Sequence, residues 1–396
     1  MKKIRTIKGE NKRMGKALLK WLPAVILACG FSTSLSADMY NGSNQAYHAS
    51  DETRFREITP NAGPRVTNGA DVFITADFIY WTARMDGLGY ARTGMDDFDG
   101  IQIADSPNAN PGSTKFPPRN FNPGFKAGIG LNLGHDGWDI YLNYTWFHSN
   151  HSNTSSSTFT DSRGLVPLWD ISTVGTIIGR DQFSAIIETF VYVESARGQF
   201  RLRFNNFDLE LGRNYYVSQY LTLRPHIGLK GSWYKENYNV TYTTFLNADI
   251  TNEVDQVRLR LTQNYWGIGM RTGLDTAWYF DKNWSIFGDV AFSGLWGRFD
   301  VTRRDFADLD VTDPATTVKV IHTSFDFHTL KPVLEFELGL RFDYWFSDDD
   351  YHFGIQAAWE EQLWINHNNV FGITDGWGSH GDLGFQGFTL KLRFDF

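Results

Sequence analysis

The chain of 396 residues has a single cysteine, 12 prolines and only one long apolar run. One cysteine excludes a framework of disulfides within the chain. Scarce proline and a 16% share of aromatic residues exclude a disordered chain. A mean hydropathy on the hydrophilic side excludes a bundle of membrane-spanning helices. Abundant aromatic residues together with 37 glycines are instead typical of a large β-protein.

Basic residues are also scarce once the N-terminus is set aside. The whole chain has a net charge of −8, although its first 37 residues carry eight basic residues and one acidic residue. The rest of the chain is therefore strongly acidic. This charge excludes a protein that binds nucleic acid through the phosphate backbone.

The long apolar run covers residues 17–31, ALLKWLPAVILACGF, and basic residues precede it. Its length and its small-residue boundary predict a signal peptide over residues 1–37, cleaved after Ala37. It is too short and too interrupted for a membrane-spanning helix. The alternative is a lipoprotein cleavage site before Cys29, which the preceding Ile-Leu-Ala only loosely resembles.

Met14 is an alternative start of the chain, and a polar segment follows the cleavage site. Translation from Met14 instead of Met1 would leave an n-region of normal length. Residues 38–70 are polar and contain Gly-Pro and Asn-Gly pairs, which predicts a flexible periplasmic leader. Residues 71–396 remain as one folded domain.

Apolar and polar residues alternate throughout this domain. Segments Phe125–Gly134 and Trp138–Phe147 alternate strictly, and Asp-Gly between them favours a two-residue hairpin turn. Ten such segments predict ten strands: Asp71–Ala83, Phe125–Gly134, Trp138–Phe147, Ala196–Leu211, Tyr220–Lys235, Val257–Phe280, Trp284–Arg298, Phe325–Phe346, Tyr351–Leu363 and Gly387–Phe396. The apolar face slips by one residue near Asn205 and near Gln263, which predicts two β-bulges.

Short connections alternate with long ones at about 84–124, 148–195, 236–256, 299–324 and 364–386. This asymmetry predicts an all-β fold, an antiparallel up-and-down transmembrane β-barrel of about ten strands with long extracellular loops. The alternative is a soluble sandwich with the same periodicity. Trp138 and Trp146, eight residues apart, favour the barrel because they are separated by about 20 Å of membrane height. The last strand alternates up to a terminal Phe396. This ending resembles the signal read by the outer-membrane assembly machinery.

Several stretches resemble a family that includes Legionella-type major outer-membrane proteins and porin-like proteins of chlamydia-related bacteria. They are DVFITADFIYW (71–81), WDIYLNYTWF (138–147), NFDLELGRNYYVSQYLTLRPHIGLKGSW (206–233) and WEEQLWINHNNVF (359–371). The resemblance covers the strands of residues 71–396. It implies a pore-forming barrel in a Gram-negative outer membrane, and it carries over no catalytic residue.

Charged residues on the polar faces fall at one height, counted from the periplasmic ends of the strands. They form a basic group and an acidic group: Arg203, Lys230 and Arg271 against Glu335, Glu337 and Glu360. We predict that these side chains line the pore and face one another across water. The alternative is a set of ion pairs that fills a narrow barrel, since ten strands lie between a filled eight-stranded barrel and an open sixteen-stranded porin.

Catalytic motifs for serine hydrolases, zinc peptidases and nucleotide binding are absent from the sequence. The remaining catalytic candidate is His322 with Asp326 and His328, near the outer end of a strand. Because polar residues are common at a water-exposed rim, we expect no catalysis from this group.

Metal binding has equally weak candidates. His148 and His151 lie in a Ser/Asn-rich stretch that is better explained as a flexible polar loop. Residues 348–350, three aspartates, are better explained as a solvated turn than as a calcium site. We therefore expect no metal and no cofactor.

The leading functional hypothesis is passive diffusion of small hydrophilic solutes or ions across the outer membrane. The first rival is a structural or adhesive barrel with a closed lumen and loops that bind partners. The second rival is an outer-membrane enzyme. Expected partners are outer-membrane lipid, the barrel assembly machinery and the solutes, with a homo-oligomer as a further possibility and no nucleic acid.

Overall fold

The computed structural model describes residues 70–93, 112–134, 137–156, 165–169, 192–246, 255–347, 351–370 and 381–396. The expected signal peptide, the choice of Met1 or Met14, Cys29, nearly all of the leader and the aspartates at 348–350 lie outside these residues. Among the described residues, no helix is both long enough and apolar enough to cross a membrane.

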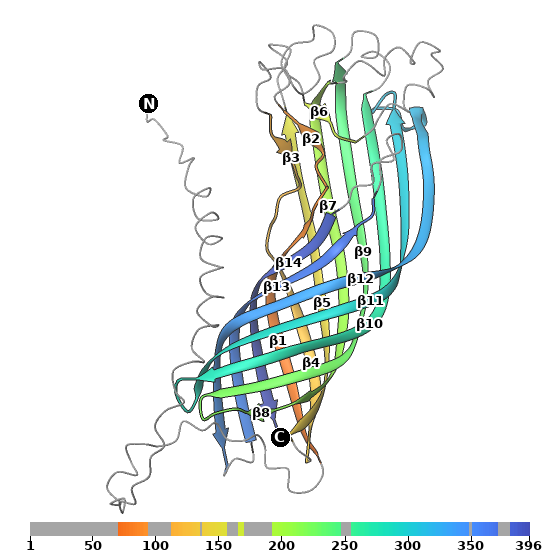
Figure 1. The fold of residues 1–396 in the computed structure, drawn as a ribbon. Coiled ribbons are helices and arrows are strands. Elements are labelled where there is room, and N and C mark those ends of the chain that lie inside the picture. The colour runs from red at the N-terminus through yellow and green to blue at the C-terminus, as the bar shows by residue number, and fades with distance from the viewer. Residues whose placement is uncertain are drawn as a thin grey trace, which may run out of the picture. The chain divides into compact units, whose positions relative to one another are not determined.

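Ten long antiparallel strands form a closed ring, as the alternating pattern predicts (Figure 1). In chain order they are β1 (Ala70–Met85), β4 (Asn122–Leu133), β5 (Trp138–Ser156), β7 (Tyr192–Arg213), β9 (Leu221–Leu246), β10 (Gln256–Tyr279), β11 (Trp284–Asp308), β12 (Thr317–Phe346), β13 (Tyr351–Asn368) and β14 (Gly381–Asp395). The short strands are β2 (Ala91–Arg92), β3 (Thr114–Lys115), β6 (Val166–Pro167) and β8 (Tyr215–Tyr216), and a 3-10 turn η2 (Pro314–Thr316) precedes β12. Each long strand pairs with its neighbours in the chain order, which confirms the up-and-down topology.

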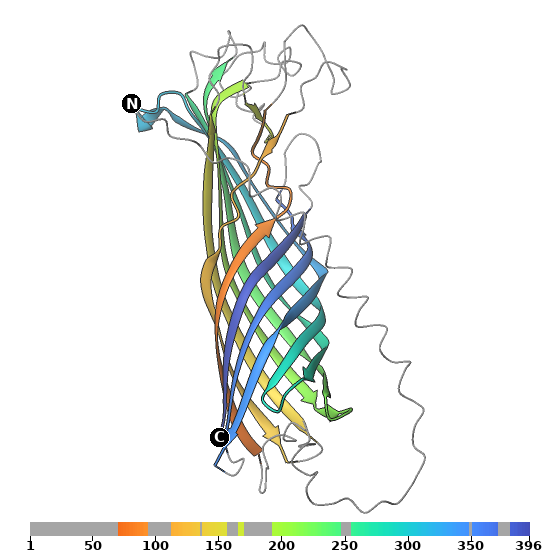
Figure 2. The same cartoon turned by 90° about the vertical axis from the view of Figure 1, so that its left-hand side faces the viewer.

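The first and last strands close the ring, and Figure 2 shows them side by side. Asp395 of β14 lies opposite Phe73 of β1, and pairing continues to Leu383 opposite Met85. The backbone N–H of Phe396 donates a hydrogen bond to the carbonyl of Val72 at 3.0 Å. Closure pairs both edges of each strand in the membrane-spanning part, which is the requirement for strands that cross a lipid bilayer.

Two aromatic girdles mark the membrane-spanning part of the outer surface. On β10, exposed Trp266 and Trp278 are separated by twelve residues, and Trp296 and Trp284 repeat this spacing on β11. At about 3.4 Å per residue and a tilt of about 45°, this spacing corresponds to about 29 Å of height, near the ~25 Å apolar band of such barrels. Between the girdles, most exposed side chains of β10 and β11 are apolar, such as Met270, as contact with lipid requires, and Thr272 is an exception.

The upper girdle contains Trp266 and Trp296, and the strands β7 and β9 to β12 continue well beyond it (Figure 1). The predicted loops at 236–256 and 299–324 are therefore largely strand, and that expectation is wrong. In this outer extension the barrel interior is mainly apolar: Tyr238, Val240 and Leu259 are fully buried, and the buried Arg303 is paired with Asp305. An apolar interior lets the strands extend into water with a core of their own.

The two predicted bulges are also wrong. The register of β7 with its neighbours is unbroken through Asn205, and that of β10 is unbroken through Gln263. Along β7, Phe204 and Asp208 both point inward, although one is apolar and the other is charged. The apolar face changes sides because the lumen changes from polar to apolar at the upper girdle. The register shifts instead at Asp305 and between Trp364 and Asn368.

Candidate functional site

The membrane-spanning half of the lumen holds a chamber of about 200 Å³ whose lining is mainly polar and charged. Small and polar residues occupy the inward positions of the strands here, which leaves this space at the centre. We call it the charged chamber. Its ionisable lining residues are Asp77, Lys126, Asp139, Asp208, Glu210, Arg224, His226, Arg271, Asp275, Asp289, Glu335, Glu337, Arg341, Glu360, Lys391 and Arg393.

Ion pairs beside the chamber join different walls of the barrel. Lys230 of β9 is fully buried, and its Nζ lies 2.7 Å from Oδ1 of Asp208 and 2.5 Å from Oε1 of Glu335. Arg271 of β10 lies 2.6 Å from the other oxygen of Glu335 and also contacts Glu210. Since β9 and β12 are three positions apart in the ring, these contacts tie together strands that do not pair.

A second pair spans the ring on the side of the closing strands. Nζ of Lys126, on β4, lies 2.6 Å from Oε2 of Glu360, on β13. Thr389 donates a hydrogen bond to the same carboxylate oxygen at 2.9 Å. Glu337 lies next to Glu360 in the β12–β13 register and lines the chamber.

The six residues predicted to line the pore therefore have different outcomes. The inward-pointing residues are Lys230, Arg271, Glu335, Glu337 and Glu360. Lys230 and Arg271 contact Glu335 directly, so the expectation that the two walls face each other across water is wrong for these pairs. Arg203 points outward, between inward Leu202 and Phe204, and so does not line the lumen. The predicted bulge at Asn205 accounts for the error, because it reversed the faces of β7 above it.

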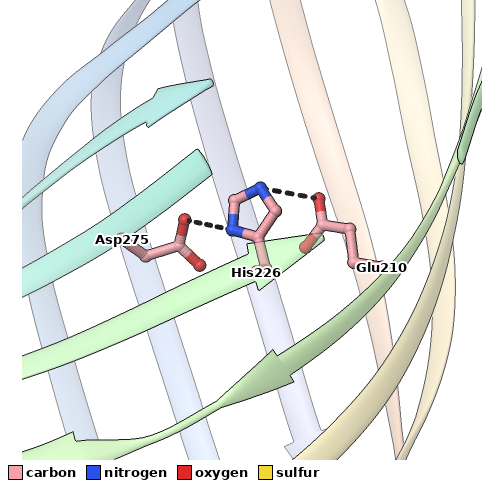
Figure 3. A group of neighbouring side chains, drawn as sticks. All are labelled: Glu210, His226 and Asp275. Carbon is pink, nitrogen blue, oxygen red and sulfur yellow. Dashed lines mark ion pairs between the residues drawn. The ribbon is translucent and has the colours of Figure 1, made fainter. Parts of the chain in front are cut away.

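Figure 3 shows three side chains of the chamber that lie close enough for a metal ion: Glu210, His226 and Asp275. One ligand atom of each lies within 4.8 Å of the others. However, two guanidinium groups already contact these carboxylates, since Arg224 lies 2.6 Å from Asp275 and 3.1 Å from Glu210, and Arg271 contacts Glu210. The local chemistry is that of a compensated ion-pair network, and a cation would have to displace an arginine.

Above the chamber, at the upper girdle, aromatic side chains from all sides of the ring meet in the lumen. Phe204 of β7 lies with its ring centroid 5.4 Å from that of Trp364 on β13 and 4.5 Å from that of Phe385 on β14. Strands β7 and β13 are five positions apart in a ring of ten, so they are opposite walls. We call this group the aromatic layer: Trp81, Phe147, Phe204, Tyr234, Tyr265, Trp364, His367 and Phe385.

The described side chains at the centre of the aromatic layer are closely packed. Trp81, Phe147, Phe204 and Trp364 each have a relative exposure of 0%. Among the described residues, these aromatic rings span the space between opposite walls, so the layer lies between the charged chamber and the outer extension. The alternation of β1 and β5 predicts that Trp81 and Phe147 point inward, but no local pattern predicts that rings from opposite walls meet.

One polar group is embedded beside the aromatic layer. Nε2 of Gln263 donates hydrogen bonds to Oη of Tyr234, to Oε2 of Glu236 and to the carbonyl of His367. Nδ1 of His367 lies 2.9 Å from Oη of Tyr234. Glu236 is fully buried and has only one described partner, so burial raises its pKa to about 8. It lies three residues beyond Trp233, on the outer side of the upper girdle.

The catalytic candidates are on the outer face of the outer extension. Asp326 lies 3.4 Å from Arg298, and His322 lies 2.8 Å from Nζ of Lys319. The ring of His328 stacks on that of Trp296 in the upper girdle. Within the described part of β12, no hydrogen bond joins Asp326 to His328, so the hypothetical pair does not form.

The two histidines considered for metal binding lie on one strand and face opposite ways. The predicted flexible loop there is wrong, since β5 continues to Ser156. His151 points inward, is 2% exposed and lies 2.7 Å from Oγ of Ser149. His148 points outward, with its ring centroid 4.1 Å from that of Trp146. Opposite faces prevent the two rings from sharing an ion.

Low similarity relates the chain to solved outer-membrane barrels: the outer membrane protease OmpT of Escherichia coli (12% identity, 83% of this chain, 96% of that chain, TM-score 0.36) and a major outer membrane protein of Thermus thermophilus (8%, 83%, 99%, 0.28). Similarity at this level carries no information about function. No curated protein matches the chain.

The family comparison is decisive. The family model described as the Legionella pneumophila major outer membrane protein precursor matches residues 64–396. This range contains every strand of the barrel, and members of the family are proteins of the bacterial outer membrane. The chain therefore belongs to the Legionella major outer membrane protein family.

Proposed function

We propose that this protein serves the outer membrane as a structural and surface-displaying barrel whose lumen is closed. The observation that carries the proposal is the aromatic layer, in which Phe204 and Trp364 meet from opposite walls. A channel for passive diffusion needs a continuous water path, and the rings of the layer occupy that path. No catalytic role is part of this proposal.

The outer extension supports a display function. Oη of Tyr238 donates to the carbonyl of Leu88 at 2.8 Å, and Oη of Tyr242 donates to the carbonyl of Tyr90 at 2.6 Å. Nε1 of Trp169 donates to the carbonyl of Gly89. Segments that follow β1 and β5 are thereby fixed to the long strands. A packed extension can hold surface loops in a constant geometry for contact with partners.

The charged chamber favours a second candidate, a channel for small hydrophilic solutes that conducts only after the aromatic layer moves. A water-accessible space of about 200 Å³ lined by both signs of charge would suit small ions. In this candidate the layer acts as a hydrophobic gate, and the ion pairs below it set selectivity.

Single-channel recording in a planar bilayer separates the two candidates. The closed-barrel proposal expects no steady conductance from the refolded wild type, and stable ion currents from a variant with Phe204→Ala and Phe385→Ala, which removes the central rings. Phe207→Ala is the matched control, because Phe207 lies on the lipid face of the same strand. Steady wild-type conductance would contradict the closed barrel and support the channel.

A further inference from the structure

The outer face of the barrel carries two basic side chains and a histidine in one row directly above the upper girdle. His148 of β5 lies opposite Arg203 of β7, which in turn lies opposite Lys235 of β9. All three occupy outward positions, and Arg203 and Lys235 are exposed. We call Arg203 and Lys235 the cationic row. Arg201 extends it one step outward, where it donates a hydrogen bond to Asn150.

The two like charges of the cationic row repel each other and so destabilise the pairing of β7 with β9. Residues directly opposite each other on paired strands have Cβ atoms about 5 Å apart, and like charges at such positions destabilise the pair. Neither Arg203 nor Lys235 has an ion-pair partner among the described residues. The nearest carboxylate on the same level is Asp300, two strands beyond Lys235 and so roughly 10 Å away. That carboxylate accepts a hydrogen bond from Arg298.

Aromatic residues lie immediately below the row on the same strands. Trp146 and Trp233 belong to the upper girdle, one outward position below His148 and Lys235. Phe207 and Tyr144 continue this surface toward the membrane centre, with ring centroids 5.8 and 6.4 Å from that of Trp233. The surface therefore changes from basic to aromatic over one step, at the level where lipid headgroups meet acyl chains.

From this arrangement we propose that the cationic row binds the phosphorylated sugar headgroup of an outer-leaflet lipid of the lipid A type. Guanidinium groups bind phosphate through two parallel hydrogen bonds, and an ammonium adds a point charge. A phosphate between Arg203 and Lys235 relieves their repulsion. The acyl chains of the same lipid then lie over Trp233 and Phe207. An amphipathic anion fits this surface better than a soluble one, because the charge and the apolar contact are adjacent.

The test measures lipid binding by the full-length chain refolded into phosphatidylcholine bicelles, with diphosphoryl lipid A as the probe. We expect Arg203→Gln with Lys235→Gln to weaken binding at least tenfold. The control is Arg260→Gln with Arg304→Gln, a second like-charged pair of opposite residues, four residues farther from the girdle. The control should bind within twofold of the wild type.

Several results would overturn the proposal: unchanged binding by the first variant, an equal loss in the control, or equal wild-type affinity for fully dephosphorylated lipid A. Soluble glucosamine phosphate at the same concentration should not compete; if it does, the site recognises phosphate without the lipid. A melting experiment guards against misfolding. Lipid A should raise the melting temperature of the wild type, whereas the Arg203→Gln and Lys235→Gln single variants should each lose part of that rise.

Discussion

Phe204 and Trp364 come from opposite walls of the barrel, yet their rings meet edge to face with centroids 5.4 Å apart and an interplanar angle of 87°. Both side chains are fully buried. A ten-stranded barrel is narrow enough for two large side chains to span its lumen. The aromatic layer therefore bridges the lumen and links strands that share no backbone hydrogen bond.

Removing Trp364 should cost much of the stability of the barrel. A buried Trp→Ala change typically lowers the unfolding free energy by about 3–5 kcal/mol, because it leaves a cavity among its neighbours. Trp296→Ala is the control, since its side chain is 56% exposed on the outer face. Urea titration of both variants in the same lipid should show a clearly smaller loss for the control. Equal losses of unfolding free energy would mean that burial in the aromatic layer adds nothing to the stabilisation by Trp364.

Removing Lys230 from its buried ion pair with Glu335 should lower the unfolding free energy, and a second substitution should recover part of the loss. Lys230→Met leaves Glu335 and Asp208 without their ammonium partner, and losing one member of a buried pair costs about 3–5 kcal/mol. Adding Glu335→Gln should restore part of that loss. A double-mutant cycle on unfolding free energies measures the coupling, and strictly additive losses would argue against contact between these residues.

Neighbouring positions on one strand should respond differently to a new charge. Leu142 is exposed on the lipid face, and Leu142→Arg should cost about 2–4 kcal/mol near the membrane midplane. Asn143 lines the charged chamber opposite Asp208, so Asn143→Arg should be tolerated. Refolding titrations compare the two, and similar costs would contradict the assigned faces of β5.

The stability of the outer extension should fall as pH rises, through Glu236. Burial raises the folded-state pKa of this carboxyl to about 8, above its ordinary value of about 4.3 in an unfolded chain. Because the folded state holds this proton more tightly than the unfolded chain, the stabilisation is fully present below the unfolded pKa. It is lost as pH rises through the folded pKa of about 8. Denaturation measured from about pH 5 to about pH 9 should show this decline. Glu236→Gln should flatten it, and an unchanged slope would exclude Glu236 as its source.

Deleting Phe396 should impair assembly in cells. This residue ends the outward row of β14, and its N–H bonds to Val72 of the strand that closes the ring. Its loss removes one closing hydrogen bond and the terminal aromatic residue that we expect the assembly machinery to read. The fraction of heat-modifiable protein in isolated envelopes reports correct insertion. Wild-type levels in the truncated protein would refute the role of Phe396.

Alternation within the membrane was predictable because lipid and lumen impose opposite polarities on neighbouring residues. Leu142 and Asn143 are on the faces that the pattern assigns. The same rule failed at Arg203, since above the girdle water replaces lipid outside and aromatic rings replace polar groups inside. A change of the lumen from polar to apolar and a one-residue β-bulge both move the apolar residues to the other set of alternating positions. Only the unbroken register of β7 distinguishes them.

The sequence by itself determined ten strands, their order and the closing role of the C-terminus, because period-two alternation and connection length are local properties. Contacts across the lumen depend on strands far apart in the chain, such as those of Lys230 with Glu335 and Phe204 with Trp364. The radius of the closed ring sets these distances, and no local pattern encodes it. The tertiary structure therefore decided that the predicted facing charges meet and that aromatic rings from opposite walls meet in the lumen.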